Sequence, residues 1–308
     1  MNAVQADQLG KTYGKTGRAL EEVSFSVEKG EIFGFIGGNG AGKTTAIKIL
    51  VGLVNPSHGS ALIFEHPAGT REAKEKIGYL PEVSNYPDWI PSGRLLDFYA
   101  SLSHSSPPGK EWISSLFSLV GLSGKEKIPL RQFSKGMMQR FGLAQSLVGD
   151  APLLLLDEPT SGLDPQAQRE MKDLLLSLRE KGKTLFFSSH QLSHVEEICD
   201  RIGILKDGRL VACASVTSLL DQEGPFEITA SPGTEALAGI APVAPQARVA
   251  VMDGKVLVPQ EQLIPALEFL RAKGVHIQGV EKKRPSLEDV FLNMVRKGPG
   301  ANEKGDRP

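Results

Sequence analysis

The chain has 308 residues, of which 40% are hydrophobic and 23% charged, and its formal net charge at pH 7 is −1. This composition is typical of one large globular domain, or of one domain with a smaller one attached. The near-zero net charge argues against bulk electrostatic attraction to nucleic acid or to acidic lipid. The N-terminal stretch MNAVQADQLGKTYGK has no apolar signal core, and runs such as LLLL at 153–156 are far shorter than the ~20 residues of a membrane helix. We therefore expect a soluble protein. Its two cysteines, Cys199 and Cys213, are expected to be buried free thiols, because their spacing matches neither a disulfide pair nor a metal site.

Strands alternate with helices along most of the chain, which predicts an α/β fold with layers of helices on a largely parallel sheet. A helix is expected after Asp164-Pro165, because apolar residues recur there at helical spacing and Gly182 provides a stop. A hairpin is expected to turn at Asp207-Gly208. The other strands expected here are 23–27, 31–36, 153–157 and 184–189, with a helix at 45–53.

The composition changes near residues 222–225, and the elements that follow differ in kind. A strand at 226–229, a hairpin turning at Asp253-Gly254, a helix at 261–274 and a strand at 275–280 predict a small separate α+β domain over 223–297. Its last helix is expected after Pro285, with Ser286 as the cap and Asp289 three residues on. The tail at 298–308, GPGANEKGDRP, is predicted to be disordered.

The stretch GGNGAGKTT at 37–45 fits the pattern G-x-x-x-x-G-K-[ST], with an apolar strand before it and a helix after it. Glycines allow backbone N–H groups to face an anion, and the helix N-terminus adds positive potential. The motif predicts a phosphate-binding loop in which Lys43 reaches the β- and γ-phosphates and Thr44 is a ligand of Mg²⁺. Many unrelated nucleotide enzymes share this motif, and a glycine-rich turn with a surface lysine is the simpler alternative.

Acidic residues follow the apolar strand LLLLD, whose carboxyl end is expected to face the same crevice as the phosphate-binding loop. Asp157 can hold a magnesium ion and Glu158 can polarise a water molecule, which indicates hydrolysis. Taken alone, Glu158 is equally well a solvated loop residue. His190 follows the strand TLFFSS and should emerge at the same edge, although a lone histidine is usually structural. The segment FSKGMMQR at 133–140 is, by itself, an ordinary capped helix.

Taken in order, these motifs resemble the ATPase subunit of the ATP-binding cassette (ABC) superfamily over residues 1–222. The resemblance implies a P-loop NTPase core with an antiparallel β subdomain and a helical subdomain at about 82–149. It implies that Glu158 is the catalytic base, that His190 contacts the γ-phosphate, and that Asp164 lies along a dimer interface. The other implied roles are adenine stacking by Tyr13; phosphate binding by Gly37, Gly38, Asn39, Gly40, Ala41, Gly42, Lys43, Thr44 and Thr45; magnesium binding by Thr44, Glu82 and Asp157; and γ-phosphate binding in the partner's site by Ser134, Lys135 and Gly136.

The chain departs from the family pattern at three site positions without losing a catalytic group. Gly38 stands where the family usually has proline, Lys135 replaces the first glycine of the usual Ser-Gly-Gly, and Glu82 stands where glutamine is commonest. The charge of Glu82 puts in doubt how that loop reports hydrolysis.

The stretches LPEVSNYPDWIPSGRLLDFYASL and PSLEDVFL resemble one branch of the family, which powers multidrug, sodium, polysaccharide and lipid exporters. The resemblance implies a homodimer that sandwiches two ATP–Mg²⁺, bound at the cytoplasmic face of the membrane to a separate permease and not to nucleic acid. Two alternatives remain at this point. One is a soluble ABC ATPase of DNA repair or translation, and the other is a nucleotide-sensing regulatory subunit with little turnover.

Overall fold

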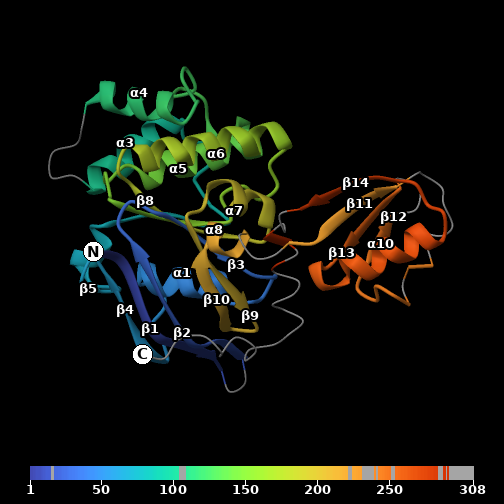
Figure 1. The fold of residues 1–308 in the computed structure, drawn as a ribbon. Coiled ribbons are helices and arrows are strands. Elements are labelled where there is room, and N and C mark those ends of the chain that lie inside the picture. Colours follow the sequence, from blue (N-terminus) through green and yellow to red (C-terminus); the bar gives the residue numbers. More distant parts are fainter. Residues whose placement is uncertain are drawn as a thin grey trace. The chain divides into compact units, whose positions relative to one another are not determined.

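The computed structural model describes residues 1–14, 17–103, 109–220, 224–230, 239–240, 242–250, 254–283, 287–288 and 290, with backbone alone at 248–250. The chain divides into two compact units, Met1–Ser215 and Val216–Arg296 (Figure 1). The division falls before the predicted boundary after residue 222, because α8 (Val216–Leu220) groups with the second unit. The predicted tail at 298–308 and the predicted turn and cap residues Asp253, Ser286 and Asp289 lie outside the described residues.

A six-stranded sheet forms the centre of the first unit, with strand order β10-β9-β3-β8-β7-β6. All neighbouring strands in it run parallel except β10, which pairs antiparallel with β9 at one edge. Every residue of β3, β7 and β8 is buried. The apolar runs in these segments predicted this, because central strands of a parallel sheet are covered on both faces. The six strands are β3 (Ile32–Ile36), β6 (Ile77–Leu80), β7 (Leu153–Asp157), β8 (Thr184–Ser189), β9 (Arg201–Lys206) and β10 (Arg209–Ser215).

Helix α6 (Pro165–Glu180) connects β7 to β8 and α7 (Leu192–Ile198) connects β8 to β9, whereas α1 (Lys43–Val51) follows β3 and leads to a second sheet. Helix α6 begins where the sequence predicted, because the Asp164 carboxylate accepts a hydrogen bond from the Ala167 N–H at 2.9 Å and Pro165 occupies the first turn. The apolar stripe of α6 is buried, and the chain leaves the helix through Gly182 at φ 83°. The hairpin of β9 and β10 turns at Asp207-Gly208, as predicted, with positive φ at both residues.

A second, antiparallel sheet with strand order β2-β1-β4-β5 packs against the first. This sheet is the antiparallel β subdomain that the family resemblance implied. The residue pattern alone predicted only part of β2, because β1 carries polar residues on both faces and has no clear alternation. Four aromatic side chains hold the two sheets together: Phe25 of β2 lies 5.3–5.8 Å, between ring centroids, from Phe33, Phe35 and Phe186. The strands are β1 (Asn2–Tyr13), β2 (Gly17–Glu28), β4 (His58–Ile63) and β5 (His66–Pro67), and the short helix α2 (Arg71–Lys74) follows them.

The remaining helices of the first unit lie together at the top of Figure 1. They are α3 (Ser92–Ser103), α4 (Lys110–Leu119), the 3₁₀ turn η1 (Leu130–Gln132) and α5 (Lys135–Ser146), all within residues 82–149. Phe141 of α5 is fully buried among them, with its ring centroid 5.2 Å from that of Tyr86 and 6.5 Å from that of Phe117. These aromatic contacts tie α5 to the segment that follows β6.

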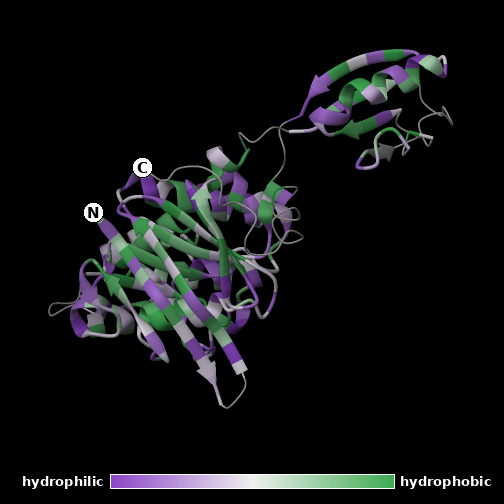
Figure 2. Ribbon diagram, turned by 60° about the horizontal axis from the view of Figure 1, so that its bottom comes forward, coloured by the Kyte–Doolittle hydropathy of each residue, from purple (hydrophilic) through white to green (hydrophobic). Residues whose placement is uncertain are grey.

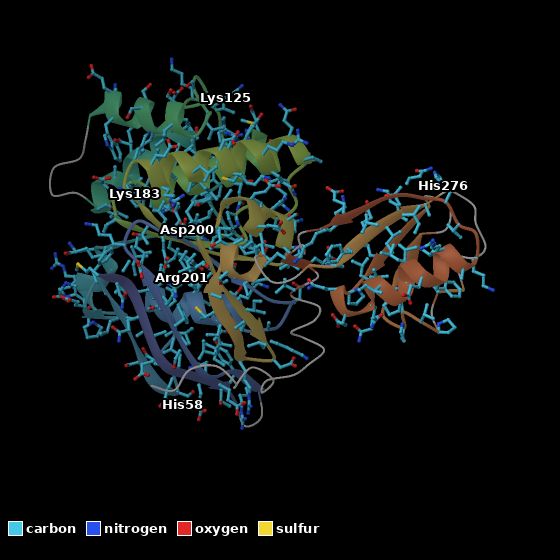
Figure 3. The ribbon with its side chains drawn as sticks, in the orientation of Figure 1. His58, Lys125, Lys183, Asp200, Arg201 and His276 are labelled. Carbon is cyan, nitrogen blue, oxygen red and sulfur yellow. The ribbon has the colours of Figure 1, made fainter. Side chains whose placement is uncertain are left out.

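Charged side chains anchor the amino ends of the central strands, where Figure 3 labels Lys183, Asp200 and Arg201. The Asp200 carboxylate accepts hydrogen bonds from the Ile32 N–H at 2.9 Å and from the Arg179 guanidinium at 2.7 Å. The Arg201 guanidinium donates to the Glu31 carboxylate at 3.1 Å. These groups are paired with one another at the edge opposite the carboxyl ends of the strands, so we interpret them as structural.

The second unit is an α+β domain with a four-stranded antiparallel sheet of order β12-β13-β11-β14. Helix α10 buries Ala266 and Leu270 against Ile228, Val256 and Val258 of the sheet. Figure 2 shows the hydrophobic and hydrophilic segments that alternate along this domain. Its elements after α8 are β11 (Phe226–Ala230), β12 (Arg248–Ala250), β13 (Lys255–Val258), η2 (Gln260–Gln262), α10 (Leu263–Ala272) and β14 (Ile277–Lys282).

Two simple expectations have different outcomes. Within the part of the chain that the structure describes, no helix is both long enough and apolar enough to cross a lipid bilayer. The prediction of two buried thiols is wrong for Cys213. Cys199 is buried behind β3, whereas Cys213 is exposed because it lies on β10, the strand at the edge of the central sheet.

Candidate nucleotide-binding site

The glycine-rich loop joins β3 to α1, as the motif predicted. Gly42 occupies the N-cap of α1 at φ 105°, and a Cβ on it would lie 2.4 Å from the carbonyl oxygen of Ala19. This position therefore requires glycine for both conformation and space. A Cβ on Gly38 would meet nothing within 4 Å, so a larger residue would also fit at this position. Lack of space is therefore not the reason why this chain has glycine where the family usually has proline.

A cavity of about 400 Å³ lies beside this loop. Its walls come from the loops that follow β3, β6, β7 and β8, at the carboxyl ends of neighbouring parallel strands, where open α/β sheets bind their ligands. Most of the predicted site residues thus lie around one space. The lining residues are Ala19, Asn39, Gly40, Ala41, Gly42, Lys43, Thr44, Thr45, Glu82, Glu158, Ser161 and His190.

The carboxylate of Glu158 lies between two basic groups in this cavity. Its Oε1 is 3.4 Å from Lys43 Nζ, and its Oε2 is 2.9 Å from His190 Nδ1. The Lys43 ammonium also donates to the Gly37 carbonyl at 2.7 Å, and the side chains of Lys43 and Glu158 are each only 7% exposed. Opposite charges are therefore paired at the centre of the site, within reach of the phosphate-binding loop.

Asp157 presents an unsatisfied oxygen next to this pair. Its Oδ1 accepts hydrogen bonds from Ser188 Oγ at 2.6 Å and from Thr44 Oγ1 at 3.2 Å, whereas its Oδ2 is buried and has no hydrogen-bond partner. A buried carboxylate oxygen without a partner is costly, and a cation satisfies it. The Thr44 hydroxyl and the Asp157 carboxylate are the oxygen ligands that Mg²⁺ takes in phosphoryl-transfer sites, together with water and substrate phosphates. These residues therefore fit the predicted ion.

The described residues contain no cluster of three or more histidine, cysteine, aspartate or glutamate side chains that could hold a metal ion by themselves. Glu82, the third predicted magnesium ligand, is exposed and lines the same cavity.

The sequence analysis missed Ser188, which organises both acidic residues. Ser188 lies opposite Asp157 in the parallel register of β7 and β8, and its Oγ accepts a hydrogen bond from the Glu158 N–H at 2.9 Å. A hydroxyl at the carboxyl end of the buried strand TLFFSS was the available signal. Ser161 also lines the cavity and lies three residues after Glu158, in the same turn. Ala19 lines it from β2, and nothing in the sequence pointed to this residue, because its place depends on how distant segments pack.

The segment FSKGMMQR does not line the cavity. Ser134 caps α5 by accepting a hydrogen bond from the Met137 N–H at 3.2 Å. The Lys135 ammonium lies over Gly162, where a Cβ would be 1.9 Å from Lys135 Nζ. A Cβ on Gly136 would lie 3.8 Å from Leu163 Cδ2. The start of α5 is therefore close to the loop that leads to Asp164, and not to the phosphate-binding loop of its own chain.

Tyr13 lies at the end of β1 and is 46% exposed. Its ring is stacked under the Lys11 ammonium, 5.2 Å from the ring centroid. Tyr13 is not among the residues that line the cavity, so its contact with a nucleotide stays a prediction.

The chain is similar to known proteins over most of its length. The ABC transporter family profile matches residues 20–161, which include the phosphate-binding loop and both acidic residues. An ABC transporter ATP-binding protein of Synechocystis sp. is 38% identical over 305 residues, an alignment that covers 96% of this chain and 85% of that protein. The chain belongs to the ATP-binding subunits of ABC transporters. As such a subunit it is an ATPase that powers transport through a separate permease.

The names of two other ABC ATP-binding subunits concern the exporter branch of the family. The linearmycin resistance ATP-binding protein of Bacillus subtilis is 32% identical, over 95% of this chain and 98% of that protein. The Nod factor export ATP-binding protein I of Burkholderia orbicola is also 32% identical, over 89% of this chain and 90% of that protein.

Solved structures confirm the predicted fold class. The ATP-binding subunit of an ABC transporter has a TM-score of 0.64 and 29% identity, over 71% of this chain and 92% of that one. A dimeric ATP-binding cassette bound to ADP and Pi has the same TM-score at 23% identity, over 69% of this chain and 98% of that one.

Proposed function

We propose that this ABC ATP-binding subunit powers export, as a homodimer that binds two ATP–Mg²⁺ between its halves and drives a permease at the cytoplasmic face of the membrane. The observation that carries the proposal is the position of Glu158, held between Lys43 and His190 in a cavity beside the unpaired oxygen of Asp157.

The residues around the cavity take complementary roles in hydrolysis. Lys43 and the backbone N–H groups of the loop at 37–45 bind the phosphates of ATP. Glu158 accepts the proton of the water that attacks the γ-phosphorus, while the bond to the bridging oxygen breaks and releases ADP and phosphate. His190, which is 2.9 Å from Glu158, moves to contact the γ-phosphate. Asp157, Thr44 and Glu82 would hold Mg²⁺, which would neutralise charge on the phosphate oxygens.

The proposal of a homodimer rests on groups that lie outside the cavity of their own chain. Ser134, Lys135 and Gly136 are not among the lining residues, and neither is Asp164. A second copy placed head to tail brings Ser134 and its neighbours to the γ-phosphate and aligns Asp164 along the interface. Tyr13 then stacks on the adenine ring. Its position supports this role, because Tyr13 lies on the β1–β2 hairpin, and that hairpin also supplies Ala19 to the cavity.

The composite site can be tested by mixing two inactive proteins. The Ser134→Arg variant should lose most ATPase activity, because a bulky cation replaces a hydroxyl that binds γ-phosphate. Mixed with a Lys43→Ala variant, it forms heterodimers in which one composite site keeps both motifs intact. We expect part of the activity to return, measured as phosphate release at increasing ratios of the two proteins. If Ser134→Arg alone is as active as the parent protein, the sandwich is wrong.

Export is the direction that the names of two relatives support, since one is a linearmycin resistance protein and the other a Nod factor export protein.

Exposed apolar side chains in the segment that follows Glu82 support a docking surface for the permease. Val83 is 72% exposed and Trp89 is 69% exposed, both in the segment that links the cavity to α3. We propose that the domain at 1–222 binds ATP and the permease, and that the domain at 223–297 is an accessory to it.

This docking surface predicts how the chain is retained on membranes. In the native host, the Val83→Glu/Trp89→Glu variant should be lost from washed membranes and should no longer co-purify with a protein that has several membrane-spanning segments. Its ATPase activity in solution should stay close to that of the parent protein. Leu102→Glu is the matched control, because Leu102 is also exposed, at 68%, on α3 of the same subdomain. Equal retention of both variants contradicts the proposed surface.

A further inference from the structure

The turn that carries Glu158 has an unusual backbone. Glu158 has a φ of 51°, in the left-handed region that residues other than glycine seldom adopt. Such a conformation persists only where the surroundings impose it. Two contacts to the backbone help: the Glu158 N–H donates to Ser188 Oγ at 2.9 Å, and the Ser161 N–H donates to the Glu158 carbonyl at 3.1 Å. The turn is therefore held in place by groups around it.

A third contact comes from α7, behind the turn. Thr160 is 4% exposed, and its Oγ1 lies 3.2 Å from Nδ1 of His194, which is 9% exposed. Burial, and then the nearby Lys172 ammonium, lower the pKa of His194, so this imidazole is neutral at neutral pH. A neutral imidazole and a hydroxyl can exchange one hydrogen bond in either direction.

Helix α7 is itself fixed to the core of the first unit. Its Glu197 pairs with Lys172 of α6. Val195 and Cys199 pack so closely on β3 that a Cβ on Gly34 would lie 2.7 Å from Val195 Cγ1 and 2.8 Å from Cys199 Sγ. His194 thus belongs to an element that cannot shift without disturbing the central sheet.

We propose that His194 is a positioning residue for hydrolysis. Its hydrogen bond to Thr160 holds the turn at 158–161 in the conformation that aims the Glu158 carboxylate at the attacking water. Helix α7 and the residues just before it then control Glu158 twice, directly through His190 and indirectly through His194. This inference rests on the proposed role of Glu158 as the base.

The test uses the full chain and compares variants that differ by one hydroxyl or one ring. Thr160→Val and His194→Leu should each lower kcat about tenfold to a hundredfold, with the KM for ATP within about twofold, because a small displacement of a catalytic group slows the chemical step more than it weakens binding. Thr160→Ser keeps the hydroxyl and should stay within about threefold of the parent protein. The double variant Thr160→Val/His194→Leu should be no slower than the slower single variant, because both changes remove the same contact.

Two controls separate positioning from stability. Thr184→Val removes another buried hydroxyl, which accepts a hydrogen bond from the Gly30 N–H at 2.9 Å at the far end of β8, and should leave kcat unchanged. In a Glu158→Gln background, Thr160→Val should cause no further loss of rate, because there is no base left to position.

Three results would overturn the inference: an unchanged kcat for Thr160→Val, equal losses for Thr160→Val and Thr160→Ser, or additive losses in the double variant. Should His194→Leu fail to fold, the two Thr160 variants decide the matter. A Glu158→Gln protein that hydrolyses ATP at the parent rate contradicts the proposed function instead, so the two failures are distinguishable.

Discussion

Replacing Glu158 with glutamine should abolish turnover while ATP still binds. The amide keeps the size of the side chain but cannot accept the proton of the attacking water, and loss of a general base costs about 10²–10⁴ in rate. Lys43, Thr44 and Asp157 remain to hold ATP–Mg²⁺. Because bound ATP joins the two halves, the Glu158→Gln protein should elute as a dimer in size-exclusion chromatography with ATP and Mg²⁺, whereas the parent protein stays monomeric.

EDTA should reverse this shift. Glu75→Gln is the matched control, because Glu75 pairs with Arg71 on the exposed surface of α2 and should change neither rate nor elution. Normal hydrolysis by Glu158→Gln would move the role of base to another acid of the cavity, with Glu82 the next candidate. If hydrolysis is slow but no dimer forms, Glu158 keeps its role as the base. The ATP-bound homodimer is then wrong, or its formation requires the permease.

Replacing Lys43 with alanine should cripple the same reaction at an earlier stage. The change removes a buried ammonium that lies against the loop carbonyls and is aimed into the cavity. Removing one group that stabilises transition-state charge costs about 10²–10³ in kcat, and binding of the triphosphate should weaken as well. Phosphate release and the fluorescence of a bound ATP analogue measure the two effects.

Lys48→Ala is the control for this variant, because Lys48 lies on the same helix but does not line the cavity. Since Lys43→Ala also leaves the buried Glu158 carboxylate without its ammonium partner, a Lys43→Met variant, which keeps most of the side-chain volume, should accompany it. Parent-like hydrolysis by both Lys43 variants would show that the loop at 37–45 does not bind the phosphates.

Several elements could be predicted because their signals are local. Strands β3, β7 and β8 each contain a continuous apolar run, and α6 carries both its cap and its buried stripe within one stretch of sequence. Strand β1 could not be predicted in this way, because its partners are distant. Val4 pairs with Val27 on one side and with Ile63 on the other, and only those pairings make its irregular pattern a strand.

The end of the first unit is a related case. Helix α8 follows β10 directly, with no change of composition to mark a boundary, and the apparent linker at 222–225 comes after it. Val216 and Leu219 of this helix are buried, and the helix groups with the second compact unit. Sequence composition reports where a chain becomes polar, whereas the limit of a compact unit depends on packing.

The sequence by itself determined the phosphate-binding loop, the acidic pair at the end of β7 and the histidine after β8, because each is a short motif at the end of an apolar strand. Only the tertiary structure decided that Glu158 lies between Lys43 and His190, that Ser188 contacts Asp157, and that α7 reaches Thr160 through His194. The physical reason is the strand order β3-β8-β7-β6, which inserts β8 between β3 and β7 although β7 precedes β8 in the chain. That order results from long-range burial of apolar strands, and it brings the carboxyl ends of β3, β8 and β7 together in the site.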